Sequence, residues 1–215
     1  EPNLQNIPTR TDLGSEIRRM FIPAEGCVLV DADYSQIELR LLAHISGDEA
    51  MRAAFTTGAD IHTATAAQVF HVAPGDVTHE MRRRAKAVNF GIVYGVSAHG
   101  LSRQTTLSRA ESAAIIDSYY RTYPRLRDYI ESLKDFARSH GYVETIMGRR
   151  RYLPDINSRN ANVRAAAERN AVNAPIQGSA ADIIKRAMID VCAALDSAGY
   201  SARMLLQVHD ELVLD

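Results

Sequence analysis

The segment MLLQVHDELVLD (residues 204–215) determines the expected architecture, because two short apolar runs in it flank a polar turn. Such runs are typical of two antiparallel strands joined by a tight turn, here at His209 and Asp210. A second apolar, β-branched run, CVLVDAD (27–33), lies near the other end of the chain and predicts a buried strand. We therefore expect a small antiparallel sheet that brings residue 33 close to residue 210.

The residues between these strands are mostly helical in pattern. Residues 1–20 read as an irregular arm, and a hairpin is expected at 142–154 with its turn near Gly148. Pro175 is expected to interrupt the last long helix. The predicted helices cover 36–46, 61–70 after the cap Asp60, 78–94 after the cap Thr78, 108–123 with a Ser108–Glu111 capping box, 124–140, 160–174 and 177–198. This pattern predicts an α+β fold in which a long helical insertion separates the strands.

The composition is that of a folded domain without an overall basic charge. Hydrophobic residues make up 46% of the 215 residues and charged residues 24%, and the formal net charge is −1. The cations nevertheless cluster at 82–86 and 149–151, so a neutral total can hide a basic groove. Two distant cysteines, Cys27 and Cys192, argue against a disulfide framework and against a cysteine zinc site.

The sequence lacks the motifs of a zinc protease, a membrane-spanning segment and a signal peptide. His79-Glu80 starts like a zinc-protease HExxH motif, but Arg83 takes the place of the second histidine. No apolar run approaches the length of about 18 residues that a membrane span needs. The first residues, EPNLQNIPTR, do not resemble a signal peptide and lack an initiator Met, which suggests a segment of a longer chain.

Two carboxylates, Asp33 and Asp210, are expected at one edge of the predicted sheet. Nearby carboxylates repel each other, and a divalent cation such as Mg²⁺ relieves that repulsion through the oxygen ligands it prefers. The alternative is that each is an ordinary strand-end or turn residue, a common place for aspartate. Position alone does not rank Asp31 and Glu211 against them, since Asp31 and Asp33 face the same side of a strand.

The segment RRRAKAVNFGIVYG (82–95) places cations directly before aromatic residues. On a helix, positions spaced four apart form one slowly winding stripe, which here contains Arg82, Lys86, Phe90 and Tyr94. The cations match the charge of a triphosphate, and the aromatic rings suit a sugar and a base. An amphipathic helix with a solvated basic end and core aromatics explains the same spacing equally well.

Three segments resemble, in the right order, motifs A, B and C of the family A DNA polymerases, the bacterial DNA polymerase I type. They are DADYSQIELR (31–40), RRRAKAVNFGIVYG (82–95) and QVHDELV (207–213). The similarity continues through EPNLQNIP (1–8), DIHTATA (60–66), GYVETIMGRRRYLPD (141–155) and NAPIQGSAAD (173–182). The resemblance implies template-directed DNA synthesis in replication and repair, by transfer of a dNMP to a primer 3′-OH.

The resemblance also implies metal ligands. Asp33, Asp210 and the backbone carbonyl of Tyr34 would bind two Mg²⁺ ions, which Mn²⁺ can replace. Glu211 would be an auxiliary acidic residue, and Asp31 would be a bystander.

Further roles follow from the same resemblance. Arg82 and Lys86 would act in catalysis by holding the triphosphate, with His62 helping. Among the remaining expected dNTP contacts, Phe90 would pack on the deoxyribose and Tyr94 would lie at the templating position. Glu38 with Tyr34 would be the steric gate against a ribose 2′-OH. Gln36 would also contact the dNTP, and Arg40 would support the site. Asn173, Gln177, Arg169 and His209 would contact the primer–template.

The implied domains are those of an incomplete right-hand polymerase. Residues 1–60 and 156–215 would form the palm with its antiparallel sheet, and 61–155 the helical fingers, including the motif B helix at 78–94. The partners would be primer–template DNA and dNTPs, with no membrane, and the protein would be a monomer in the bacterial cytoplasm, associated with the nucleoid. A non-catalytic dNTP- or DNA-binding fragment is the alternative, because nothing here resembles a thumb. A two-metal nuclease or phosphatase fits less well, since hydrolysis does not need an aromatic stripe.

Overall fold

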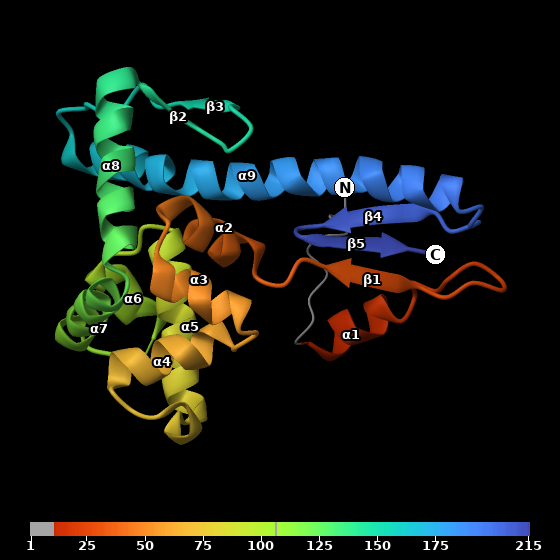
Figure 1. Cartoon of the computed structure of the whole chain (residues 1–215), viewed down its shortest axis with the longest axis horizontal. Coiled ribbons are helices and arrows are strands. Elements are labelled where there is room, and N and C mark those ends of the chain that lie inside the picture. The colour runs from red at the N-terminus through yellow and green to blue at the C-terminus, as the bar shows by residue number, and fades with distance from the viewer. Residues whose placement is uncertain (1–10, 106) are drawn as a thin grey trace. The chain divides into compact units, whose positions relative to one another are not determined.

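A computed structural model describes residues 11–105 and 107–215, which form two compact units (Figure 1). Unit 1 contains the described residues up to Ser35 together with Ala181–Asp215, and unit 2 contains Gln36–Ala180. The chain therefore enters unit 2 once and returns to unit 1 within the long helix α9 (Ala161–Ser197). Within the described residues, no helix combines the length and the apolarity required to cross a membrane.

Unit 1 contains the predicted antiparallel sheet. Its strands are β1 (Val30–Asp33), β4 (Met204–Val208) and β5 (Glu211–Leu214), in the order β1-β5-β4. In the register of β1 and β5, Asp33 lies opposite Glu211 and Val30 lies opposite Leu214. The expected pairing of the first strand with the last hairpin is confirmed, as is the α+β class.

Two expectations about unit 1 are wrong. The irregular arm contains a helix, α1 (Asp12–Arg18), because the Thr11 side chain accepts a hydrogen bond from the Gly14 amide and caps it. Strand β1 is exposed along its whole length rather than buried, because it lies at the edge of the sheet. The buried strand residues are Leu212 and Leu214 of the central strand.

Unit 2 is mainly helical, and its helices begin where the cap residues predict. Asp60, Thr78 and Ser108 each accept a hydrogen bond at a helix start, and the Ser108–Glu111 capping box is complete. Helices α3 and α6 and the short 3-10 helix η2 were not anticipated. The elements are α2 (Ile37–Ser46), α3 (Glu49–Thr56), α4 (Ile61–Phe70), η2 (Pro74–Asp76), α5 (His79–Val93), α6 (Ala98–Gln104), α7 (Arg109–Thr122) and α8 (Pro124–His140).

The core of unit 2 lies among these helices, where α4 packs along α5 and α7. It includes Tyr119 and Tyr123, whose ring centroids lie 4.9 Å apart in an edge-on arrangement. The other large, fully buried side chains of this core are Leu39, Leu42, Met51, Ile61, Val88, Ile92, Leu101 and Leu126. This core holds the α4–α5 pair in place, and those two helices carry half of the predicted nucleotide contacts, namely His62, Arg82, Lys86 and Phe90.

The predicted hairpin forms from β2 (Tyr142–Glu144) and β3 (Arg150–Tyr152), and it packs against α9. A Cβ at Gly178 would lie 2.6 Å from the Thr145 methyl carbon, so this close approach requires glycine. The expected interruption at Pro175 is wrong, because α9 continues through it. A proline removes one backbone hydrogen bond, and the buried residues on both sides, Ala171, Val172, Ile176 and Ala180, hold the helix together.

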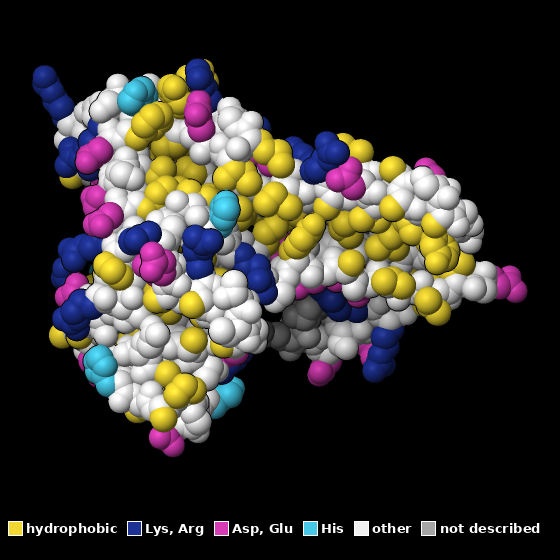
Figure 2. All heavy atoms as spheres, viewed as in Figure 1, with side chains coloured by type: hydrophobic (Ala, Val, Ile, Leu, Met, Phe, Trp, Pro, Cys, Tyr) yellow, Lys and Arg dark blue, Asp and Glu magenta, His cyan; other side chains and the backbone are white. Residues whose placement is uncertain are grey.

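Exposed apolar side chains occur mainly in unit 1. Figure 2 shows hydrophobic atoms gathered over the part of unit 1 that contains α9 and β4. Leu205 and Ile189 are 44% and 66% exposed. The described part of unit 1 therefore leaves many apolar side chains exposed.

Candidate functional site

The predicted carboxylate pair forms in unit 1. Asp33 ends β1, Asp210 lies in the turn between β4 and β5, and the Tyr34 amide donates to the Asp210 carbonyl at 3.1 Å. His209 adopts a left-handed backbone conformation (φ 55°) that makes this turn tight. Desolvation, and then repulsion from the Asp210 carboxylate, raise the pKa of Asp33 above its ordinary value. The two carboxylates are therefore close enough to interact electrostatically.

These groups suit a hard divalent cation. Both are oxygen ligands, and their mutual repulsion is relieved when a cation binds between them. In residues 11–105 and 107–215, no group of three or more His, Cys, Asp or Glu side chains is arranged to hold a metal ion. The pair fits Mg²⁺ of the kind that takes one or two protein carboxylates and completes its shell with water and substrate phosphates.

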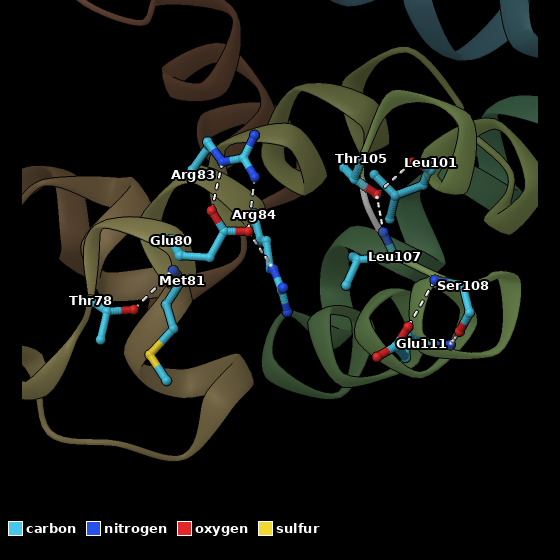
Figure 3. A network of polar contacts seen from close by, with 10 residues as sticks. All are labelled: Thr78, Glu80, Met81, Arg83, Arg84, Leu101, Thr105, Leu107, Ser108 and Glu111. Atoms are coloured by element: carbon cyan, nitrogen blue, oxygen red, sulfur yellow. Dashed lines mark hydrogen bonds and ion pairs between the residues drawn. The ribbon is translucent and has the colours of Figure 1, made fainter.

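The four cationic side chains of helix α5 lie in different environments. Arg83 and Arg84 both bind the Glu80 carboxylate of the same helix, at 2.8 and 2.9 Å, and Figure 3 shows both side chains turned toward it. Arg82 instead reaches α4, where its Nε lies 2.7 Å from a carboxylate oxygen of Asp60. Lys86 is exposed, and no ion pair involves it among the residues described.

Asp60 has two functions at the start of α4. Its carboxylate caps the helix through the Thr63 amide and holds the Arg82 guanidinium through two hydrogen bonds. Desolvation alone would raise the pKa of Asp60, but the hydrogen bonds from Arg82 and Thr63 outweigh it and hold the pKa well below its usual range. The carboxylate thereby fixes the position of Arg82 relative to α4.

This ion pair predicts a difference in acid sensitivity. A lowered pKa means that Asp60 stabilises the fold above the unfolded-state pKa of about 4, and that this contribution is lost as the pH falls below it. Asn in place of Asp60 keeps a helix cap but has no charge to lose. Urea unfolding between pH 6 and pH 2 should show the wild type losing about 1 kcal/mol more than Asp60→Asn, a value kept small because the pair is partly exposed. Equal losses would contradict this role.

His62 and Phe90 adjoin each other beside the cations. His62 on α4 is 3% exposed, and its ring centroid lies 5.7 Å from that of Phe90 on α5. Desolvation lowers the pKa of His62, Asp60 opposes this, and Arg82 and Lys86 lower it further. Asn89 on α5 lies 3.0 Å from the Nδ1 atom of His62, a contact that the sequence did not reveal.

The aromatic end of the stripe adjoins a cavity. The Tyr94 hydroxyl donates to a Glu38 carboxylate oxygen at 3.0 Å, which joins α5 to α2. Gly95 follows in a left-handed conformation (φ 65°) that ends the helix. A cavity of about 600 Å³ is lined here by Phe90, Tyr94, Gly95 and Arg169, among others. Its volume is within the range of small-molecule sites.

The remaining predicted residues fall in several places. Gln36 precedes α2 in a left-handed conformation (φ 58°), which is uncommon for a side chain other than glycine, and Arg40 lies over the Phe55 ring at 4.8 Å. Tyr34 and Asp31 belong to unit 1, where Asp31 lines an apolar groove together with Glu211. The side chain of Gln207, which precedes the turn, donates to the His209 carbonyl at 2.9 Å.

A basic groove on unit 2 includes two of the predicted primer–template residues. Asn173 and Gln177 of α9 line a cavity of about 400 Å³ together with Arg149, Arg150 and Arg151 of the hairpin. These arginines are the second cation cluster of the sequence, at residues 149–151. Arg150 is paired with Glu144 at 2.7 Å, and Arg149 donates to the Gly178 carbonyl at 3.0 Å. The hairpin arginines and the α9 amides thus form one polar surface.

Comparison with known proteins identifies the family to which the chain is similar. A sequence model described as DNA polymerase family A matches residues 1–215. The chain is 56% identical over its whole length to the DNA polymerase I of Geobacillus stearothermophilus and 57% identical to that of Streptococcus pneumoniae (strain TIGR4), covering 25% of each. The thermostable DNA polymerase I of Thermus thermophilus is 55% identical, with 26% of its length covered. The chain thus spans about a quarter of the length of these relatives.

A solved structure matches the fold as well. The POL domain of Pol1 from M. smegmatis, in complex with a DNA primer-template and dNTP, has a TM-score of 0.93 and 51% sequence identity. The match covers 100% of this chain and 38% of that one.

Proposed function

Because the chain belongs to DNA polymerase family A, we propose that it contains the nucleotidyl-transfer site of a DNA-directed DNA polymerase. Its substrates would be dNTPs and a primer–template, the same kinds of molecule that are bound in the matching Pol1 complex. A monomer at the bacterial nucleoid, acting in replication and repair, is consistent with this activity.

The observation that carries the proposal is the ordered arrangement along α5. Arg82 is held by Asp60, Lys86 is exposed, and Phe90 adjoins both His62 and the cavity next to Tyr94. Arg83 and Arg84 are engaged by Glu80, so they do not belong to this arrangement. A triphosphate needs cations and a nucleoside needs an aromatic face, and α5 offers them in that order.

The proposed reaction transfers a dNMP to a primer. The primer 3′-OH loses its proton to solvent as its oxygen attacks the α-phosphorus in line. The bond between the α-phosphorus and the oxygen that bridges to the β-phosphate breaks, and pyrophosphate leaves with the negative charge. Arg82 and Lys86 stabilise the charge that develops on the phosphates, and Phe90 with Tyr94 orients the nucleoside. Positioning and electrostatics provide most of the catalysis in such reactions.

Asp33 and Asp210, with the Tyr34 carbonyl, are the proposed ligands for Mg²⁺. Bound divalent cations would lower the pKa of the primer hydroxyl and neutralise charge on the leaving phosphate. Glu211, opposite Asp33 in the sheet register, is the auxiliary acidic group of this proposal.

Glu38 is the proposed steric gate against ribonucleotides. We expect Glu38→Ala to raise the incorporation of rNTPs relative to dNTPs by at least about tenfold, since removing a clash worth about 1.4 kcal/mol has that effect. Single-nucleotide incorporation kinetics with matched dNTP and rNTP pairs would measure it. Unchanged selectivity would refute the assignment.

The matched control for this prediction is Tyr94→Phe. It removes the hydroxyl that donates to Glu38 but keeps the carboxylate in the protein. If Glu38 excludes the 2′-OH by its volume alone, Tyr94→Phe keeps full selectivity. If the hydrogen bond is needed to hold Glu38 in place, Tyr94→Phe relaxes selectivity too.

A direct test of the proposal is primer extension by the 215-residue chain with Mg²⁺ and dNTPs. The same assay would use a chimaera in which these residues replace the matching quarter of the Geobacillus stearothermophilus enzyme. Extension by either protein supports the polymerase site. If the chimaera is folded but inactive while dNTPs and DNA still bind the chain, the alternative of a non-catalytic binding fragment is correct.

A further inference from the structure

A chain of buried polar groups connects His62 to the core of unit 2. Asn89 lies 3.0 Å from His62 Nδ1, the Thr65 hydroxyl lies 3.2 Å from the Asn89 carbonyl oxygen, and the Tyr123 hydroxyl lies 3.2 Å from Thr65. All four side chains are at most 3% exposed. These groups come from α4, α5 and the residue that follows α7.

The protons in this chain can be placed by counting donors. Thr65 has one hydroxyl proton, and it donates that proton to the Asn89 carbonyl oxygen. Tyr123 must then be the donor in its contact with Thr65. The Asn89 carbonyl oxygen faces Thr65, so the amide NH₂ faces His62, and Nδ1 of His62 is the acceptor.

The reverse order is less favourable. If His62 Nδ1 donated to the Asn89 oxygen, the amide would donate to Thr65 and Thr65 to Tyr123. The Tyr123 proton would then be buried without an acceptor among the described residues, which is costly. In the forward order, the hydroxyl protons of Thr65 and Tyr123 both have an acceptor.

The other ring nitrogen of His62 remains available. Nε2 has no hydrogen-bond partner among the described residues. The fully buried side-chain atoms without a partner in that part of the chain are Ser112 Oγ, Tyr119 OH and Asn173 Oδ1, and Nε2 is not one of them. It is therefore not completely enclosed by protein atoms. His62 lies beside Phe90 and close enough to Arg82 and Lys86 for their charges to act on it.

We propose that Asn89 is a positioning residue that fixes His62 as the neutral tautomer with its proton on Nε2. The Nε2–H group of His62 is then a hydrogen-bond donor for a nucleotide phosphate. The part that concerns the phosphate rests on the proposed function, and the tautomer does not. A neutral ring suits the site, because burial, Arg82 and Lys86 all disfavour the imidazolium and only Asp60 favours it. The fixed proton supplies a donor without adding charge.

The tautomer can be measured in the wild-type chain without any nucleotide. Long-range proton–nitrogen correlation spectra of ¹⁵N-histidine-labelled protein would be recorded at neutral pH, with His62 assigned from its loss in His62→Gln. We expect Nδ1 at the chemical shift of an unprotonated nitrogen and Nε2 at that of a protonated one. The opposite pattern, or the averaged shifts of exchanging tautomers, would overturn the proposal.

Asn89→Asp tests the cause of the tautomer. A carboxylate can only accept from the ring, so Nδ1 should become protonated, and the pKa of His62 should rise. Thr65→Val removes the hydroxyl that orients the amide and should produce a mixture of tautomers. Asn162→Asp adds the same charge on an exposed part of α9 and should change neither. An unchanged His62 spectrum in a folded Asn89→Asp protein would contradict the role of Asn89.

A measurement of dNTP binding distinguishes a failure of this proposal from a failure of the proposed function. With this protein, at a pH where His62 is neutral in both the wild type and the variant, we expect Asn89→Asp to weaken dNTP affinity by about tenfold, as the loss of one charge-assisted hydrogen bond would. If no dNTP binds the wild type while the tautomer is as expected, the proposed function fails and the tautomer assignment stands. If Asn89→Asp switches the tautomer without changing dNTP affinity, the phosphate-donor role of His62 is refuted.

Discussion

Replacing Asp210 with alanine is expected to reduce primer extension by at least about a thousandfold, because a metal ligand contributes several kcal/mol to transition-state stabilisation. The same loss is expected for Asp33→Ala. Each substitution removes one member of the carboxylate pair at the end of the unit 1 sheet. Pre-steady-state extension with the chimaera and saturating dNTP would measure the loss in the rate constant.

Asp31→Ala is the matched control for these two variants. Asp31 lies on the same strand as Asp33, but it lines the apolar groove and is not a proposed ligand. We expect extension within a few-fold of the wild type. A loss in Asp31→Ala as large as in Asp33→Ala would mean that the strand as a whole, and not the paired carboxylates, is responsible.

The second large effect is expected for Lys86→Ala. Lys86 is exposed and has no ion pair among the described residues, so its charge is available for a triphosphate. Removing this cation from the developing charge should lower kcat/KM for dNTP by about 10²- to 10³-fold. Both kcat and KM should change, since the cation contacts the nucleotide before and during the reaction.

Arg83→Ala is the comparison on the same helix. It also removes a cation, but one that binds Glu80 (Figure 3) and is not a member of the stripe. We expect less than a threefold change in kcat/KM. Equal losses in the two variants would indicate that the net positive charge of α5 matters and that the position of each cation does not.

Much of the local structure could be predicted because its signals are local. Asp60, Thr78 and Ser108 stand directly before the helices they cap, and the polar turn at His209–Asp210 separates two apolar runs. These features depend on residues within a few positions of each other. Pro175 misled the prediction because the packing of α9, a tertiary effect, outweighs the local cost of a proline.

The members of the candidate site could be proposed from the sequence, whereas the contacts between them could not. Spacing placed Arg82, Lys86, Phe90 and Tyr94 on one stripe, and motif similarity suggested roles for them. The partners that orient these groups lie far away in sequence. Asp60 is 22 positions from Arg82, and His62 is 27 positions from Asn89. Such pairs depend on how α4 packs on α5, which no local pattern specifies.

The pairing of β1 with β5 joins residues roughly 180 positions apart, with all of unit 2 between them. Closing so long a loop in an unfolded chain is entropically costly and slow, whereas helices that contact their sequence neighbours form quickly. Unit 2 should therefore fold first and shorten the effective loop before the sheet forms. The carboxylate pair would then be assembled by one of the last contacts to form, so an incompletely folded chain could already present the stripe of α5 while lacking its proposed metal ligands.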